Sequence, residues 1–410
     1  MTASIRIDDL SAPQLDETQR AAIAFASGLD LSFDPHALLA RARERTGLTD
    51  FGSDDFVPRL AATTEAIEAD TGLGSLGRLI LHQRIVRLLA NRLLVEDAVS
   101  RHPEILEVQL TAPIVVIGLP RSGTTHLVNL IAADARLRSL PYWESLEPVP
   151  GTGPDDRRAR CEAAYRAQVQ MAPHIVAMHH QYPDAIEEEI ELEDIDFASY
   201  TLEWHARVPG WRDFYLALDQ VPHYAYMKKV LQLLTWYHGP NRWVLKSPQH
   251  LEQIPALLAA FPDATFAVTH RDPVSVVRSA VTMLAYGDRM RRDHIDPDAL
   301  VEYWADRIER LLRACVRDHA LLPASRTVDV LFHEFMADDA AMVRRVYERA
   351  ELPVTATARA AHGDYLATNP RGRYGQVSYD LAGDFGVDPA RLRERFAFYF
   401  ERFPVEVEAP

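Results

Sequence analysis

The chain has 410 residues, of which 48% are hydrophobic and 25% are charged, a balance typical of folded globular proteins. Its 59 acidic residues outnumber the 44 lysines and arginines. The resulting net charge of −15 argues against a general binder of nucleic acid or anionic membranes, because both require a basic surface. The two cysteines are too few for a disulfide framework or a cysteine-rich zinc site.

Residues 1–20 contain no apolar stretch of the kind that a secretory signal requires. Nowhere does the chain approach the ~18 to 20 consecutive apolar residues that cross a bilayer as a helix. We therefore expect a cytoplasmic protein without a transmembrane segment.

Residues from about 14 to 100 are predicted to form successive helices. Between residues 79 and 93 apolar side chains recur at spacings of three to five, which places them on one helix face, and arginines occupy the other faces. We interpret residues 1–110 as a helical N-terminal region packed on the rest of the protein.

Strands alternate with helices from residue 113 onward. Residues 114–117 are apolar and β-branched without polar alternation, which is typical of a buried parallel strand. Further strands are predicted at 242–245, 264–269 and 327–332, and helices follow them near 249–260, 273–285 and 337–350. This alternation predicts an α/β fold with a doubly wound parallel sheet, whose ligands bind at the carboxyl ends of the strands.

The stretch from about 150 to 240 is predicted to be mostly helical and is strongly acidic. Seven of the ten residues from 187 to 196 are acidic. A run of charges of this kind is usually the solvated face of a helix, and we interpret most of these carboxylates in that way.

A loop with two glycines follows the first predicted strand. Glycine is scarce in this chain, at 18 of 410 residues, yet Gly118 and Gly123 enclose a loop of four residues that leads into a helix. This is the glycine spacing of a P-loop, in which backbone N–H groups and the helix N-terminus converge on an anion. Hydroxyl donors come from Ser122, Thr124 and Thr125. The sequence therefore predicts a phosphate-binding loop.

The loop differs from one that binds a nucleoside triphosphate. Thr124 stands where such a loop carries the lysine that reaches the β- and γ-phosphates, and the cation here, Arg121, lies inside the loop. The pattern suits a single 5′-phosphate that bears a transferable group. Two alternatives remain, a kinase-like P-loop nucleotide-binding protein and a non-catalytic interaction module built on a degenerate P-loop.

Residues 114–130, which read IVVIGLPRSGTTHLVNL, resemble the 5′-phosphosulfate loop of bacterial sulfotransferases. The resemblance continues in residues 243–279 and around RGRYG at 371–375, and it covers about residues 111–410. We interpret 111–410 as a sulfotransferase domain of P-loop-like fold, with a helical insertion at about 150–240 on the acceptor side. The resemblance implies that the donor is 3′-phosphoadenosine 5′-phosphosulfate, that 3′-phosphoadenosine 5′-phosphate is released, and that no metal is required.

The resemblance also implies which residues bind the donor. Family members hold its 3′-phosphate with an arginine and a serine spaced like Arg271 and Ser279, and they close a basic loop over it that corresponds to Arg371, Gly372 and Arg373. The residues expected around the 5′-phosphosulfate are Arg121, Ser122, Gly123, Thr124, Thr125 and His126.

Sulfuryl transfer requires in-line geometry, cations that neutralise the leaving oxygen, and a base for the acceptor proton. We expect Arg121 on the leaving-group side, and Lys246, at the end of a predicted strand, near the sulfonate oxygens. His250 is the leading candidate for the base because it resembles the family's catalytic histidine, although it follows the lysine by four residues instead of two. The alternatives are His179, His180 and Glu188.

The acceptor is expected to offer a hydroxyl, with an amine as the alternative, on a small or lipid-like molecule. Aromatic residues are frequent in the middle segment and favour an apolar or aromatic alcohol. A homo-oligomer is compatible with the sequence, which leaves the oligomeric state open.

Overall fold

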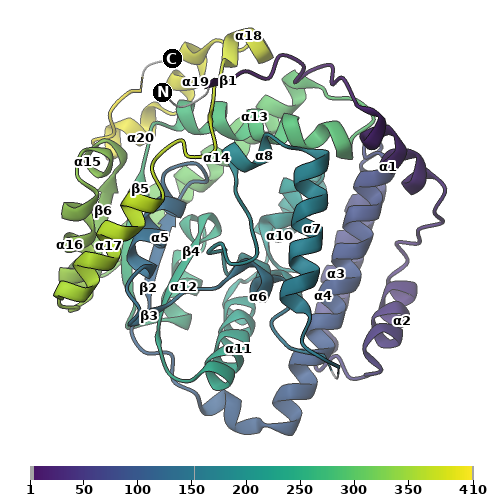
Figure 1. The fold of residues 1–410 in the computed structure, drawn as a ribbon, viewed down its shortest axis with the longest axis horizontal. Coiled ribbons are helices and arrows are strands. Elements are labelled where there is room, and N and C mark those ends of the chain that lie inside the picture. Colours follow the sequence, from purple (N-terminus) through teal and green to yellow (C-terminus); the bar gives the residue numbers. More distant parts are fainter. Residues whose placement is uncertain (1–3, 152, 409–410) are drawn as a thin grey trace.

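The computed structural model describes residues 4–151 and 153–408 and is built around a five-stranded parallel sheet (Figure 1). In spatial order the strands are β3 (Leu137–Arg138), β4 (Arg242–Ser247), β2 (Ile114–Gly118), β5 (Thr265–His270) and β6 (Thr327–Leu331). Val116 of β2 lies opposite Lys246 of β4 and Ala267 of β5. The predicted parallel sheet is confirmed.

Helices cover both faces of this sheet, because alternate residues of the buried strands point to opposite sides. Ile114 and Val116 pack with α5 (Thr124–Ala132) and α16 (Asp339–Arg349). Val115 and Ile117 belong to a larger core on the other face. The helices of that core include α11 (Val221–His238), α12 (Ile254–Ala260), α13 (Pro273–Arg291) and α14 (Pro297–Asp318). The sheet is therefore doubly wound, as the sequence predicts.

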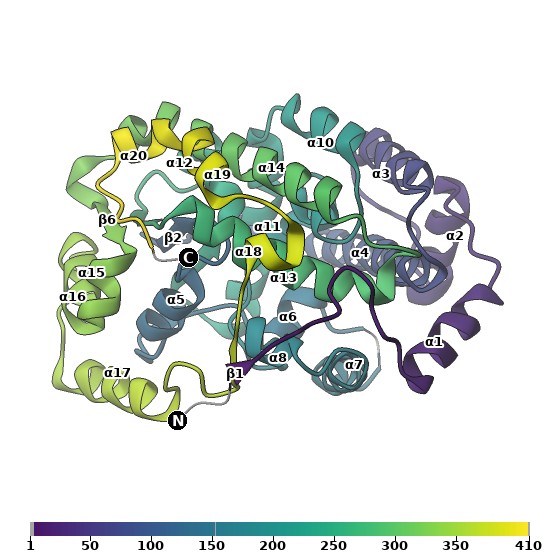
Figure 2. The same cartoon turned by 90° about the horizontal axis from the view of Figure 1, so that it is seen from above.

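The helices predicted before residue 100 are present. They are α1 (Glu17–Ser27), α2 (Pro35–Thr46), α3 (Val57–Ala69) and α4 (Ser75–Arg101), with short 3-10 turns at Asp54–Phe56 and Pro103–Glu107. Leu81, Ile85 and Leu89 of α4 are buried in the same core as Val115 and Leu231. Figure 2 shows α2, α3 and α4 side by side at the end of the molecule opposite α16 and α17 (Ala356–Thr368).

The segment between β3 and β4 is mostly helical and ends with the long helix α11. Before α11 it contains α6 (Tyr142–Leu146), α7 (Arg157–Met171), α8 (Ile175–Met178), α9 (Ile190–Glu193), the 3-10 turns η3 (Asp194–Asp196) and η4 (Tyr200–Trp204), and α10 (Pro209–Leu216). The predominantly helical character predicted for this stretch is confirmed.

The acidic run 187–196 is buried, so the prediction that most of its carboxylates lie on a solvated face is wrong. Glu193 is 0% exposed and Asp196 is 3% exposed. Arg84 and Arg92 of α4 supply the compensating charge, with hydrogen bonds of 2.9 Å to Asp194 and 2.7 Å to Asp196. Asp194 and Asp196 therefore face arginines of the N-terminal helices and not water.

The C-terminal segment returns to the sheet and meets the N-terminus. It contains α15 (Phe332–Ala337), α18 (Leu381–Phe385), α19 (Pro389–Arg395) and α20 (Ala397–Arg402). Three 3-10 turns precede this segment in the chain, at Pro248–Leu251 (η5), His319–Leu321 (η6) and Ala324–Arg326 (η7). The short strand β1 (Ser4–Ile5) pairs in parallel with β7 (Gln376–Val377). Among the described residues, no helix combines the length and the apolar character needed to cross a membrane.

Candidate active site

The predicted phosphate loop joins the carboxyl end of β2 to the N-terminus of α5, in the middle of the sheet. A Cβ atom on Gly118 would lie 1.8 Å from Thr269 Oγ1 on the neighbouring strand, so only glycine fits there. Gly123 has a φ of +89°, which favours glycine, and Arg121 adopts a φ of +65° inside the loop. These residues turn the chain so that α5 begins at Thr124, with its unpaired N–H groups at the loop.

The hydroxyl groups of the loop have different surroundings. Ser122 is buried, donates a 2.6 Å hydrogen bond to the Leu119 carbonyl and lies 2.7 Å from Thr269 Oγ1, so it holds the loop against β5. Thr124 is buried and Thr125 is exposed at the start of α5. Thr125 is therefore the hydroxyl of this helix start that is open to a ligand.

Arg121, Arg271 and Ser279 come together at this loop. Arg271 follows β5 directly, and its Nη1 donates a 2.6 Å hydrogen bond to the Arg121 carbonyl. The Arg121 Nε donates a 2.9 Å hydrogen bond to Ser279 Oγ on α13. The sequence predicts these residues near the donor, and in the fold hydrogen bonds link them across the ends of β2 and β5.

Arg271 is also held from the C-terminal tail. Its Nε and Nη2 donate hydrogen bonds of 2.6 Å each to the two carboxylate oxygens of Glu408. Its guanidinium lies 4.0 Å from the centre of the Phe332 ring. The arginine thus has a fixed orientation and an anionic partner.

The basic loop 371–373 lies beside the start of α5. Arg371 donates a 2.8 Å hydrogen bond to Asp339, whose carboxylate is also 3.2 Å from His126 Nε2. Arg373 instead bonds within its own turn, to the Thr368 carbonyl at 2.9 Å. Gly372 has a φ of +73° at the tip of this turn. The loop is therefore joined to His126 through Asp339.

Lys246 and Glu188 form an ion pair at the carboxyl end of β4, the strand next to the loop. The lysine is 1% exposed and the glutamate side chain is 19% exposed. Removal from water raises the pKa of Glu188 to about 7, even though the Lys246 charge acts in the opposite direction. A carboxylate with this pKa can gain and lose a proton near neutral pH.

His250 is enclosed by protein groups. It is 0% exposed, its Nε2 lies 2.7 Å from Glu189 Oε1, and its Nδ1 lies 2.7 Å from Tyr224 Oη. Glu189 Oε2 accepts a 2.8 Å hydrogen bond from the Lys246 backbone N–H. Because both ring nitrogens of His250 already have hydrogen-bond partners, His250 holds Glu189 in place next to the Glu188–Lys246 pair. This geometry favours a positioning role over the role of base that the sequence favours.

The other two histidine candidates have different environments. Removal from water lowers the pKa of His179 to about 3, and the charges of Lys246 and Arg121 act in the same direction, so this imidazole is neutral. His180 Nε2 lies 2.9 Å from Tyr165 Oη, and its ring packs 4.1 Å from the ring of Tyr374. His180 is thus part of an aromatic cluster beside the basic loop.

Sequence reasoning missed the role of Glu189 at this site. It is one of three successive glutamates, and nothing in the local pattern distinguishes the residue that holds His250 from the one that pairs with Lys246. The sequence shows an acidic run and, separately, a lysine at a strand end, but only the fold shows that the two lie together.

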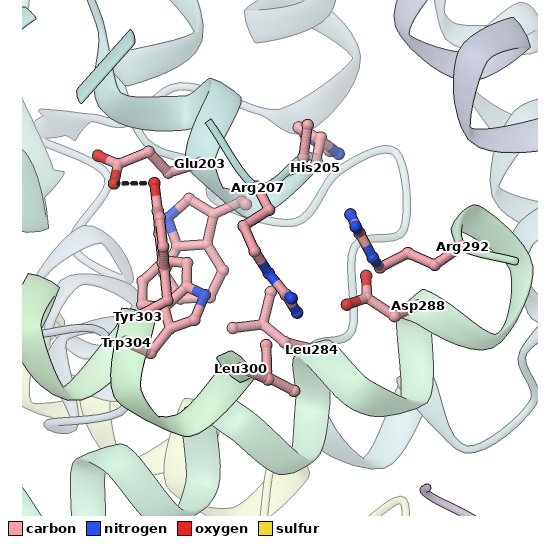
Figure 3. Close-up of a pocket in the computed structure, with 11 residues that line it drawn as sticks. Glu203, His205, Arg207, Leu284, Asp288, Arg292, Leu300, Tyr303 and Trp304 are labelled. Carbon is pink, nitrogen blue, oxygen red and sulfur yellow. Dashed lines mark hydrogen bonds between the residues drawn. The ribbon is translucent and has the colours of Figure 1, made fainter. Parts of the chain in front are cut away.

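The aromatic residues of the middle segment lie mostly in the core. Tyr200, Tyr215 and Tyr224 are buried, and Trp204 packs 4.2 Å from the ring of Trp304. Figure 3 shows the cavity beside the rings of Tyr303 and Trp304, with Arg207 among the side chains that line it. Its volume of about 20 Å³ accommodates a single water molecule, so it is too small for an acceptor in this structure.

Comparison with known proteins shows the family and the fold of this chain. The sulfotransferase family profile matches residues 113–356. Over 310 residues the chain is 24% identical to the omega-hydroxy-beta-dihydromenaquinone-9 sulfotransferase Stf3 of Mycobacterium tuberculosis (strain CDC 1551 / Oshkosh), an alignment that covers 68% of this chain and 78% of the relative. The same identity and coverage are found for Stf3 of Mycobacterium bovis.

Two solved structures share the fold. The sulfotransferase STF9 from Mycobacterium avium superposes with a TM-score of 0.83 at 25% identity, and the match covers 93% of this chain and all of that one. STF1 from Mycobacterium tuberculosis H37Rv gives a TM-score of 0.78 at 28% identity, covering 88% of this chain and 98% of that one. The family match spans more than half of the chain and includes the loop, the Lys246 strand and Arg271. The chain therefore belongs to the sulfotransferase family and is a sulfotransferase.

Proposed function

We propose that this enzyme transfers a sulfuryl group from 3′-phosphoadenosine 5′-phosphosulfate to a hydroxyl group. One observation carries the choice of donor: Arg271 bonds the backbone of Arg121, and Arg121 bonds Ser279. Two cations and a hydroxyl thus converge beside a loop whose helix N-terminus attracts anions. The 5′-phosphosulfate binds at residues 121–126, and Arg271 and Ser279 take the 3′-phosphate.

The transfer follows an in-line path at the carboxyl ends of β2 and β4. The acceptor oxygen forms a bond to sulfur while the bond from sulfur to the bridging oxygen breaks, and the bisphosphate leaves with the electron pair. Arg121 and Lys246 stabilise the negative charge on the bridging and sulfonate oxygens. No step uses a metal ion.

We assign the base to Glu188. Its carboxylate is partly exposed, bonds Lys246 and has a pKa near the working pH, as a general base requires. As the acceptor hydroxyl attacks, its proton moves to Glu188. His250 and Glu189 act as positioning residues that hold the Lys246 backbone beneath this pair.

The acceptor we propose is a hydroxyl on a lipid-like molecule. The Stf3 relatives are named for an omega-hydroxylated dihydromenaquinone, a lipid that carries a hydroxyl. The burial of Glu189, Glu193, Asp194 and Asp196 supports the same choice, because these carboxylates present no hydrated anionic surface to an apolar chain.

Isothermal titration with 3′-phosphoadenosine 5′-phosphate, in buffer containing EDTA, tests the choice of donor. We expect metal-free binding that Arg271→Ala weakens about tenfold or more, which corresponds to a hydrogen-bonded charge pair of about 1.5–3 kcal/mol, while binding of 5′-AMP changes little. Arg166→Ala is the matched control, since the Arg166 side chain is 76% exposed on α7. Absence of binding without metal, or equal losses for the two nucleotides, would refute the assignment.

A further inference from the structure

Three potential metal ligands meet at the end of the sheet that lies next to Arg271. They are His270 at the end of β5, His319 at the start of η6, and Asp329 on β6. One ligand atom from each lies within 4.8 Å of the other two. Asp329 Oδ1 is 3.0 Å from His270 Nε2 and 2.7 Å from His319 Nε2.

These distances suit a small divalent cation. Zinc binds imidazole nitrogen and carboxylate oxygen at about 2.0–2.2 Å, so two ligand atoms on a tetrahedral ion lie about 3.3 Å apart. The nitrogen–oxygen distances of 3.0 and 2.7 Å therefore need to open by about 0.3 and 0.6 Å, while the two imidazole nitrogens, which lie within 4.8 Å of each other, both turn toward the ion. Two imidazoles and one carboxylate form a set that first-row divalent metals favour over magnesium or calcium.

The ring nitrogen of His270 that faces away from Asp329 already has a hydrogen-bond partner. His270 Nδ1 lies 2.7 Å from Tyr399 Oη, and Tyr399 is 1% exposed, so the ring is fixed with Nε2 directed at Asp329. The Phe403 ring packs 4.1 Å from the His270 ring and 5.2 Å from the His319 ring. Metal-binding histidines characteristically use the second ring nitrogen in this way.

The site opens to solvent on one side. His270 is 0% exposed, whereas the side chains of His319 and Asp329 are 13% and 45% exposed. An ion can therefore enter past Asp329 without unfolding of the core. A water molecule can complete its coordination.

We propose that His270, His319 and Asp329 bind one first-row divalent transition-metal ion, for which Zn²⁺ is the representative. The ion takes no part in sulfuryl transfer. It ties the end of β5 to η6, directly after α14, and to the middle of β6, next to Arg271. The inference rests on the three ligands and is independent of the choice of sulfuryl donor.

Equilibrium dialysis of the purified full chain against Zn²⁺, with metal content read by mass spectrometry, tests the site. We expect one Zn²⁺ per chain, and Tm higher by about 3 °C when free Zn²⁺ is 100 times its Kd. His319→Gln and Asp329→Asn should each weaken binding at least tenfold, while His36→Gln, a change at an exposed histidine of α2, should leave it unchanged.

Absence of bound Zn²⁺ in the wild-type chain would overturn the proposal, as would variants that bind Zn²⁺ as tightly as the wild type. Circular dichroism shows whether each variant is folded. A second readout needs no variant: Co²⁺ in a tetrahedral site of this kind gives visible absorption bands that one equivalent of Zn²⁺ abolishes. If Co²⁺ added to the wild-type chain gives no such bands, the proposal fails.

Discussion

The contact between Glu408 and Arg271 makes a sharp prediction about donor affinity. The Glu408 carboxylate accepts two hydrogen bonds of 2.6 Å from the Arg271 guanidinium. If Arg271 binds the 3′-phosphate, the carboxylate must leave before the phosphate can take its place. Glu408→Gln removes this competing charge and should tighten binding of 3′-phosphoadenosine 5′-phosphate. The tail itself stays anchored, because the Glu408 backbone N–H donates a 2.9 Å bond to Asp272.

The size of the effect follows from the burial of the pair. The side chains of Arg271 and Glu408 are 20% and 26% exposed, so the pair lies between a surface ion pair, worth up to about 1 kcal/mol, and a buried charged hydrogen bond, worth about 1.5–3 kcal/mol. We take about 1–2 kcal/mol as the free energy of the Glu408–Arg271 pair that donor binding must overcome. Its loss in Glu408→Gln lowers the Kd for 3′-phosphoadenosine 5′-phosphate about fivefold to thirtyfold.

Isothermal titration at two salt concentrations measures this change. The gain should shrink at high salt, since the pair is partly exposed and screened. Glu406→Gln is the control, because the Glu406 side chain is 70% exposed in the same tail and its nearest basic partner is His333 at 3.7 Å. An unchanged or weaker affinity in Glu408→Gln would refute the reasoning, and Arg271→Ala would then show whether the arginine binds the donor at all.

Three further predictions concern the base, the loop and the core. Glu188→Gln should lower kcat about 10²–10⁴-fold, because the general base is lost. In the wild type, protonation of this carboxylate should lower the rate below pH about 7, and the variant should not show that loss. A flat wild-type pH–rate profile from pH 6 to 8 would contradict this. Gly118→Ala should destabilise the fold by about 1–3 kcal/mol in urea unfolding, because its Cβ would lie 1.8 Å from Thr269 Oγ1, and adding Thr269→Ala should restore part of the loss; no rescue would mean that this contact is not the cause. Arg307 of α14 is buried and forms ion pairs with the buried carboxylates of Glu203 and Glu252. Arg307→Met leaves both carboxylates without their cation and should lower the free energy of unfolding by about 3–5 kcal/mol, or Tm by about 5 °C in calorimetry. Arg313→Met, at a side chain that is 59% exposed, should change Tm little, and equal shifts would show that burial does not set the cost.

The central strands and the loop between β2 and α5 could be predicted because their signals are local. An apolar β-branched run marks a buried strand wherever it lies, and Gly118 and Gly123 mark the turn after it. Predicted strands 242–245, 264–269 and 327–332 correspond to β4, β5 and β6 with shifts of at most two residues at their ends. The contact of Arg271 with the loop follows in turn, since adjacent parallel strands end at the same edge.

The burial of the acidic run could not be predicted because it depends on partners far away in the sequence. Asp194 and Asp196 are neutralised by Arg84 and Arg92, each more than 100 residues earlier. A local pattern of charges is the same whether it faces water or arginines on another helix. The same limitation affects His250: its spacing from Lys246 is visible in the sequence, whereas its enclosure depends on the packing of α11 and the acidic run.

The pairing of β1 with β7 also affects how the protein is prepared. Ser4 and Ile5 form a strand with Gln376 and Val377, and Gln376 lies three residues after the basic loop. Glu408, near the other end of the chain, bonds Arg271. Residues joined directly to Ser4 or to Glu408 therefore start beside the proposed donor site and not on a remote surface. Tag-free protein, or a tag cleaved close to its junction, is the appropriate material for measuring nucleotide affinity.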